Sequence, residues 1–165
     1  MLLYSHFGYN LKVTDMQAAI GCAQLKKFPS FVERRRYNFK RLKEALLDLE
    51  EWLILPEPCE NAIPSWFGFL ITCKENIKRN HLVQYLEQNG VQTRMLFAGN
   101  LTKHPCFDEM RNLKTGYRIV GELKNTDRIM SDTFWIGVYP GMTDEMLDYM
   151  AEVIHNGVKQ QLSKQ

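Results

Sequence analysis

Two polar positions in the sequence have the chemistry to hold an anion. Asn10 lies in a Gly-Tyr-Asn loop ahead of a run of small residues, and a side-chain amide can donate hydrogen bonds to phosphate oxygens. Arg128 lies ahead of an apolar run, and a guanidinium can bind a carboxylate or phosphate through two parallel hydrogen bonds. Each has a structural alternative, because Asn10 is also a common turn residue and Arg128 can instead pair with Asp127 or Glu122.

A complete active site needs a nucleophile or an acid–base pair and a means of holding the reactive group. The sequence has no serine nucleophile elbow, no glycine-rich phosphate loop and no metal-binding His-Glu helix motif. The four cysteines and four histidines show no metal or redox spacing. We therefore expect no catalytic residue and no metal site in this chain. Cys22 and Cys73 lie in apolar stretches and are expected to be buried.

The overall composition is that of an ordinary globular domain. The 165 residues carry a net charge of +2, which indicates neither a nucleic-acid nor a membrane partner. The basic residues between Glu33 and Lys43 are best explained as a solvated helix face. Apolar runs are much shorter than a membrane span, and the first residues do not resemble a secretory signal. We expect a cytoplasmic protein.

Capping signals and periodicity predict the elements that position the candidate residues. A capping box at Thr14 begins a helix of small residues, in which Gly21 indicates close packing against another element. We expect this helix to end at Phe28-Pro29 and a second, of about five turns, to begin at Ser30. Further along, alternation and apolar periodicity predict strands at 52–55, 66–73, 91–96 and 134–138, helices around 82–86 and 126–131, a loop at 97–123, and a final helix capped by Thr143.

This order of elements predicts an α/β (α+β) fold with a small, mostly antiparallel sheet covered by helices. One pair of strands is joined by a loop without a helix, which favours antiparallel pairing over a wholly parallel sheet.

Several stretches, in order along the chain, resemble the DegT/DnrJ/EryC1/StrS sugar aminotransferase family. They are residues 8–21 with Gln24-Leu25, residues 64–69, residues 93–102 and residues 125–141. Leu96-Phe97-Ala98-Gly99-Asn100-Leu101 and the strand from Thr133 to Pro140 are most similar to one branch. That branch is the CDP-4-keto-6-deoxy-D-glucose 3-dehydratases of lipopolysaccharide biosynthesis.

The resemblance implies the C-terminal small domain of the aspartate-aminotransferase-like (fold type I) fold. Residues 1–28 then belong to the end of the large domain or its interface, and residues 29–165 form the small domain. The implied cofactor of the full-length enzyme is pyridoxamine 5'-phosphate, or pyridoxal 5'-phosphate in the aminotransferases. The cofactor carries the difficult chemistry and the protein positions it. Because the cofactor-anchoring half precedes Met1, we expect this chain to bind no cofactor and to be inactive alone.

The resemblance also assigns roles to four residues. Asn10 matches an asparagine that reaches the phosphate of the neighbouring subunit's cofactor. Arg128 matches an arginine of the small domain that would hold the sugar or its diphosphate. Arg94 and the loop ending at Asn100 match a segment near the sugar site.

The implied partners are a large N-terminal domain, a second copy in a homodimer, a nucleotide-linked deoxysugar, and a flavin and iron–sulfur reductase. Two alternatives remain open. One is part of a pyridoxal-phosphate-dependent nucleotide-sugar aminotransferase, and the other is a non-catalytic ligand-binding or oligomerisation module.

Overall fold

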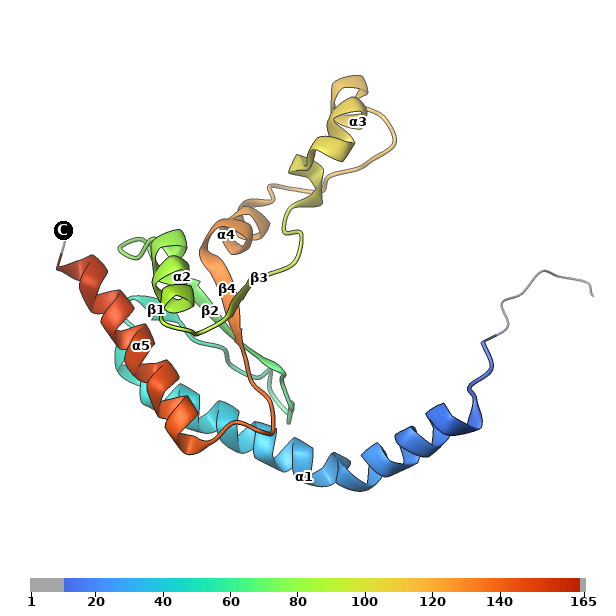
Figure 1. Ribbon diagram of the computed structural model, residues 1–165. Coiled ribbons are helices and arrows are strands. Elements are labelled where there is room, and N and C mark those ends of the chain that lie inside the picture. Colours follow the sequence, from blue (N-terminus) through green and yellow to red (C-terminus); the bar gives the residue numbers. More distant parts are fainter. Residues whose placement is uncertain (1–10, 164–165) are drawn as a thin grey trace, which may run out of the picture.

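A computed structural model describes residues 11–163 of the chain. Its elements follow the predicted order closely (Figure 1). The helices are α1 (Asp15–Leu46), α2 (Arg79–Gln88), α3 (Asp108–Leu113), α4 (Lys124–Asp132) and α5 (Asp144–Leu162). The strands are β1 (Leu53–Ile54), β2 (Gly68–Cys73), β3 (Thr93–Met95) and β4 (Thr133–Gly137). Three short 3-10 helices are η1 (Leu47–Leu49), η2 (Leu101–Lys103) and η3 (Pro105–Phe107).

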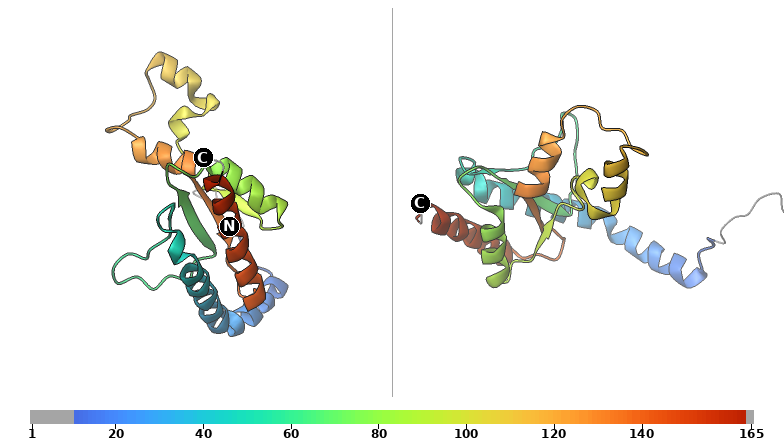
Figure 2. Two further views of the ribbon diagram at one scale, coloured as in Figure 1. Left: turned by 90° about the vertical axis from the view of Figure 1, so that its left-hand side faces the viewer. Right: turned by 90° about the horizontal axis from the view of Figure 1, so that it is seen from above.

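The four strands form one sheet in the order β1-β2-β4-β3. Every neighbouring pair is antiparallel, which confirms the predicted sheet type. Helices α1 and α5 run beside one another on one side of this sheet (Figure 2), and α2 packs against α5. The predicted start of the last helix is also confirmed, because the Thr143 side chain accepts a hydrogen bond from the backbone N–H of Met146.

The predicted break at Pro29 is wrong. A single helix of 32 residues passes through Pro29, and it is visibly curved in Figure 1. Proline removes one helix hydrogen bond, and the helix continues on both sides of it. Ser30 does not cap a second helix, since its hydroxyl donates to the carbonyl of Lys27 within α1. The capping box at Thr14 is confirmed, with reciprocal hydrogen bonds between Thr14 and Gln17.

The first half of α1 packs against nothing in the described part of the chain. Met16 and Ile20 are 80% and 63% exposed, and a Cβ added at Gly21 would meet no atom within 4 Å. Cys22 is exposed rather than buried, because the apolar residues around it have no partner here. Apolar side chains left exposed along a helix normally meet another part of a larger protein. The assignment of residues 1–28 to a large domain stays a prediction.

The second half of α1 is anchored to α5. Arg34 and Arg41 pair with Asp144 and Asp148, so the basic stretch is not simply a solvated face. The buried Asn38 donates a hydrogen bond to the carbonyl of Tyr139 in the turn before α5. These polar contacts surround a core of apolar side chains from α1, α5 and the sheet, which includes Leu42, Leu46, Phe69, Ile71, Phe134, Ile136 and Ile154, all 0% exposed.

The reactivity of the four cysteine thiols should differ between the exposed positions and the buried core. Cys22, Cys59 and Cys106 are exposed, whereas Cys73 is 2% exposed. Burial, aided by the charge of Asp132, raises the pKa of the Cys73 thiol to about 12, so almost no thiolate forms near neutral pH. We expect a thiol reagent to label three of the four cysteines in the native chain and Cys73 only in denaturant, with each site followed by peptide mass spectrometry. Labelling of native Cys73 at the rate of Cys59 would contradict the described core.

The stretch predicted as a loop at 97–123 contains the short elements η2, η3 and α3. In both figures this segment extends away from the sheet before the chain returns through α4 (Figures 1 and 2). Helix α3 has only six residues and no buried residue, so it offers no apolar periodicity by which a sequence pattern can be recognised.

Candidate functional site

The two faces of the sheet differ sharply in what covers them. Residues directly opposite one another in an antiparallel pair point to the same face. Phe69 pairs with Ile136 and Ile71 with Phe134, and all four side chains are fully buried against the helices. Leu70 pairs with Trp135, which pairs in turn with Arg94, so these three side chains lie on the opposite face.

This second face, defined by Gly68, Leu70, Arg94 and Trp135 and called here the open face, remains partly uncovered. Leu70 is 37% exposed, and Arg94 is an exposed residue. Helix α4 packs against β2 and β4, and the neighbouring Thr133 is buried at 2% exposure. The open face is therefore the part of the sheet that the described chain leaves accessible.

An aromatic cluster occupies the centre of the open face. A Cβ added at Gly68 would come within 2.7 Å of the Trp135 ring, so the indole lies directly against the Gly68 backbone. The rings of Phe67 and Trp135 meet edge to face, with centroids 5.4 Å apart and an interplanar angle of 88°. Trp135 lines two neighbouring cavities, one with Phe67 and Phe97 and the other with Arg94.

The loop after β3 is held against α4. Gly99 has a φ of +66°, and a Cβ there would overlap the side chain of Met130, so this close approach requires glycine. Asn100 is 3% exposed; its amide donates to Asp127, and its carbonyl oxygen accepts from the backbone N–H and the hydroxyl of Thr102. Because these groups are already engaged, any effect of Asn100 on a substrate would act through the loop. Its substrate-binding role stays a prediction.

Asp127 makes this attachment sensitive to acid. Hydrogen bonds from Lys103 and then Asn100 hold the pKa of Asp127 below its ordinary value of 3.8. A carboxyl group whose folded pKa is depressed stabilises the fold above its unfolded pKa, and that stabilisation is lost as pH falls through the folded pKa. We expect hydrogen-exchange protection factors in residues 97–104 to begin to fall near about pH 5 and to go on falling as the pH drops below 3.8. Asp127→Asn should remove most of this change, and an unchanged pH response in that variant would contradict the assignment.

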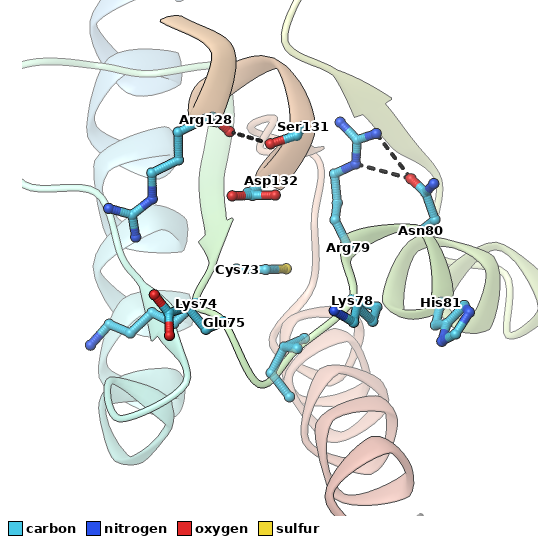
Figure 3. Close-up of a pocket in the computed structure, with 11 residues that line it drawn as sticks. Cys73, Lys74, Glu75, Lys78, Arg79, Asn80, His81, Arg128, Ser131 and Asp132 are labelled. Carbon is cyan, nitrogen blue, oxygen red and sulfur yellow. Dashed lines mark hydrogen bonds between the residues drawn. The ribbon is translucent and has the colours of Figure 1, made fainter. Parts of the chain in front are cut away.

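Arg128 lies in a different place, a surface cleft between the end of β2, the start of α2 and the end of α4 (Figure 3). Its side chain makes no hydrogen bond or ion pair with another described residue. The sequence-based alternative of an ion pair is not observed, since Asp127 pairs with Lys103 and Glu122 with Lys124. The cleft also contains Lys74, Lys78 and Arg79 together with the acidic Glu75 and Asp132, and it is called here the basic cleft.

The structure therefore separates the predicted site residues. Arg94 lies on the open face, Arg128 lines the basic cleft, and Asn100 is buried between the loop and α4. Asn10 lies outside the described residues. The sequence-based assignment missed Trp135, although β4 reads Thr-Phe-Trp-Ile-Gly, with apolar side chains on both faces. A strand of that kind is typical of a sheet covered on both sides.

Among residues 11–163 no group of three or more His, Cys, Asp or Glu side chains is placed to hold a metal ion. In the same range, no helix combines the length and apolar character needed to cross a bilayer. The two open-face cavities contain Arg94 as their single charged residue in the described chain.

The fold is thus an antiparallel sheet with α1, α2 and α5 on one face and a partly uncovered aromatic face on the other. The chain belongs to the DegT/DnrJ/EryC1/StrS aminotransferase family, whose family model matches residues 2–155. Its fold is the C-terminal part of the aminotransferase fold.

Among curated relatives, the chain is 55% identical over 149 residues to the lipopolysaccharide biosynthesis protein RfbH of Salmonella typhimurium, covering 89% of this chain and 33% of that protein. It is 47% identical over 153 residues to dTDP-4-dehydro-2,6-dideoxy-D-glucose 3-dehydratase of Saccharopolyspora spinosa, covering 92% and 32%. The structure of E. coli GDP-4-keto-6-deoxy-D-mannose-3-dehydratase with bound hydrated PLP superposes with a TM-score of 0.76 at 28% identity, covering 89% and 36%. The chain thus spans about a third of the length of the curated relatives it matches.

Proposed function

We propose that this chain is the C-terminal small domain of a vitamin-B6-dependent 3-dehydratase that acts on a nucleotide-linked 4-keto-6-deoxy sugar. The observation that supports this proposal most strongly is the 47% identity, over 92% of the chain, to a relative named as a 3-dehydratase of a dTDP-linked deoxysugar. The high identity to a lipopolysaccharide biosynthesis protein supports a role in making deoxysugars for lipopolysaccharide, in the cytoplasm.

In this proposal the chain forms only part of the enzyme. The relatives are about three times as long as the matched region, and the first half of α1 is apolar and exposed. A polypeptide equivalent to the remaining two-thirds of the relatives would cover this helix and supply the cofactor-anchoring residues. Dimerisation would then bring Asn10 to the partner subunit's cofactor phosphate.

Within such an assembly the cofactor, pyridoxamine 5'-phosphate, supplies the electron relay for removal of the C3 hydroxyl. The part of this chain is to position the substrate and exclude water. Arg94 and Arg128 supply guanidinium groups for the diphosphate or sugar, and the Asn100 loop holds one wall of the site. A separate flavin and iron–sulfur reductase would supply electrons to the product.

Assembly from two pieces tests this function. The chain is co-expressed with the N-terminal two-thirds of the Saccharopolyspora spinosa relative and purified with pyridoxamine 5'-phosphate. Reversible loss of the C3 hydroxyl exchanges that oxygen with heavy-oxygen water. Because the C4 ketone also exchanges its oxygen by hydration, the nucleotide sugar is returned to ordinary water to wash out the ketone label, and mass spectrometry then detects the label that remains at C3. We expect exchange from the assembled pair and from neither piece alone.

Two other results would overturn the proposal. Glutamate-dependent formation of an amino sugar by the assembled pair, without loss of the C3 oxygen, would identify an aminotransferase. Exchange catalysed by the isolated chain would show that it carries a complete active site.

A further inference from the structure

We infer that the open face binds the sugar ring of a nucleotide-linked 6-deoxyhexose against Trp135, with Arg94 holding the diphosphate. This inference rests on the proposed function and adds the surface and the parts of the ligand that it takes. The indole and the guanidinium belong to residues paired directly across β4 and β3, and both line the same cavity.

The indole is fixed in place before any ligand arrives. The indole packs directly on the Gly68 backbone, since a Cβ at Gly68 would lie 2.7 Å from the ring. The Phe67 ring contacts the indole edge to face. A binding group held in one position loses little conformational entropy when a ligand binds. Phe97, which is 81% exposed and has a φ of +47°, lines the same apolar cavity.

The chemistry of the two cavities matches the two parts of such a ligand. The cavity between Phe67 and Phe97 is lined only by apolar side chains and a glycine. A 6-deoxyhexose offers it a methyl group and ring C–H bonds, which pack well against aromatic side chains. The neighbouring cavity contains Arg94 as its charged residue in the described chain, and a diphosphate is complementary to that guanidinium.

The basic cleft around Arg128 is less suited to this ligand. It contains no Phe, Tyr or Trp side chain, and Glu75 and Asp132 oppose its positive charges. Arg79 already donates to the carbonyl of Met130 and to the side chain of Asn80. Such a cleft can attract phosphate, but it has no surface that distinguishes a deoxysugar.

Nitrogen-edited NMR of the 165-residue chain locates the ligand directly, because its three tryptophans give separate indole signals. GDP-L-fucose is compared with GDP-L-galactose, which differs only by a hydroxyl at C6, and with GDP alone. We expect the Trp135 indole and the Arg94 side-chain N–H to shift with GDP-L-fucose, while Trp52 stays unchanged. GDP-L-galactose should bind more weakly, because its hydroxyl loses water in an apolar cavity.

Variants separate the sugar contact from the phosphate contact. Trp135→Ala should weaken GDP-L-fucose about tenfold, the usual effect of losing one stacked ring, and leave GDP nearly unchanged. Trp135→Phe keeps an aromatic ring and should bind with intermediate affinity, which guards against misfolding of the alanine variant. Arg94→Gln should weaken all three nucleotides and reduce their salt dependence. Phe28→Ala and Arg118→Gln remove an exposed ring and an exposed cation elsewhere and should change nothing.

If the nucleotides changed the chemical shifts of Lys78 and Arg128 but not that of the Trp135 indole, this inference would be overturned and the proposed function would stand. Absence of any shift at nucleotide concentrations on the order of 10 mM would also overturn it. The oxygen-exchange assay on the two-piece assembly decides the proposed function independently of either result.

Discussion

Truncating Phe134 to alanine is expected to lower the free energy of unfolding by about 3–5 kcal/mol. The Phe134 ring is 0% exposed at the centre of the sheet, where it pairs with Ile71 across β2 and faces the helices. The variant loses the transfer free energy of the ring, and it leaves a cavity that the surrounding strands cannot fill. Urea unfolding followed by circular dichroism gives the change directly from the midpoint and slope.

The matched control for this variant is Phe97→Ala. It removes the same atoms from a side chain that is 81% exposed, so the free energy of unfolding should change by less than about 0.5 kcal/mol. A similar loss of stability in both variants would mean that Phe97 is buried in solution, and the described open face would then be wrong.

Replacing Gly157 by valine is expected to lower the free energy of unfolding by about 1–3 kcal/mol. Gly157 lies in α5 where α2 crosses it, and an added Cβ would come within 2.7 Å of Leu82 and 2.9 Å of Tyr85. Valine is a better helix former than glycine, which offsets part of the loss. The overlap dominates because both neighbouring side chains belong to the packed interface of the two helices.

Gly21 supplies the control for this second prediction. It also lies within a helix, but an added Cβ would meet nothing within 4 Å. Gly21→Val should therefore leave the free energy of unfolding unchanged or raise it by a few tenths of a kcal/mol. In the two-piece assembly the same substitution should weaken association, if the first half of α1 is covered there as proposed. A destabilising effect of Gly21→Val in the isolated chain would show that α1 packs against part of this chain.

The open face and the exposed half of α1 are the two apolar surfaces that the described chain leaves uncovered. Both present apolar side chains that an isolated domain would ordinarily bury, including Met16, Ile20, Phe67 and Phe97. In the proposed enzyme the same surfaces meet the rest of the polypeptide and the substrate. The basic cleft remains a second charged surface, and the NMR experiment determines whether nucleotides prefer it.

Local signals in the sequence were sufficient for most elements of the fold. The hydroxyls of Thr14 and Thr143 cap helices whose first residues lie within one turn of them, and Gly90, with a φ of +75°, follows the end of α2 as predicted. The apolar face of α5 is likewise a pattern repeated every three to four residues. Such features depend on neighbours close in sequence, so they can be recognised without the tertiary structure.

The resemblance of ordered motifs also identified the family, but the arrangement of the site was decided by contacts between distant residues. Asn100 is buried because Asp127, 27 positions away, accepts its hydrogen bond. Arg94 and Arg128 face different cavities because Arg94 lies on β3, whereas Arg128 lies on α4, which packs against β2 and β4. The sequence by itself determined most of the helices and strands, apart from the continuity of α1 through Pro29 and the short helices between residues 97 and 123. Only the tertiary structure decided which side of each element meets a partner, because that depends on strand register and helix packing across the whole domain.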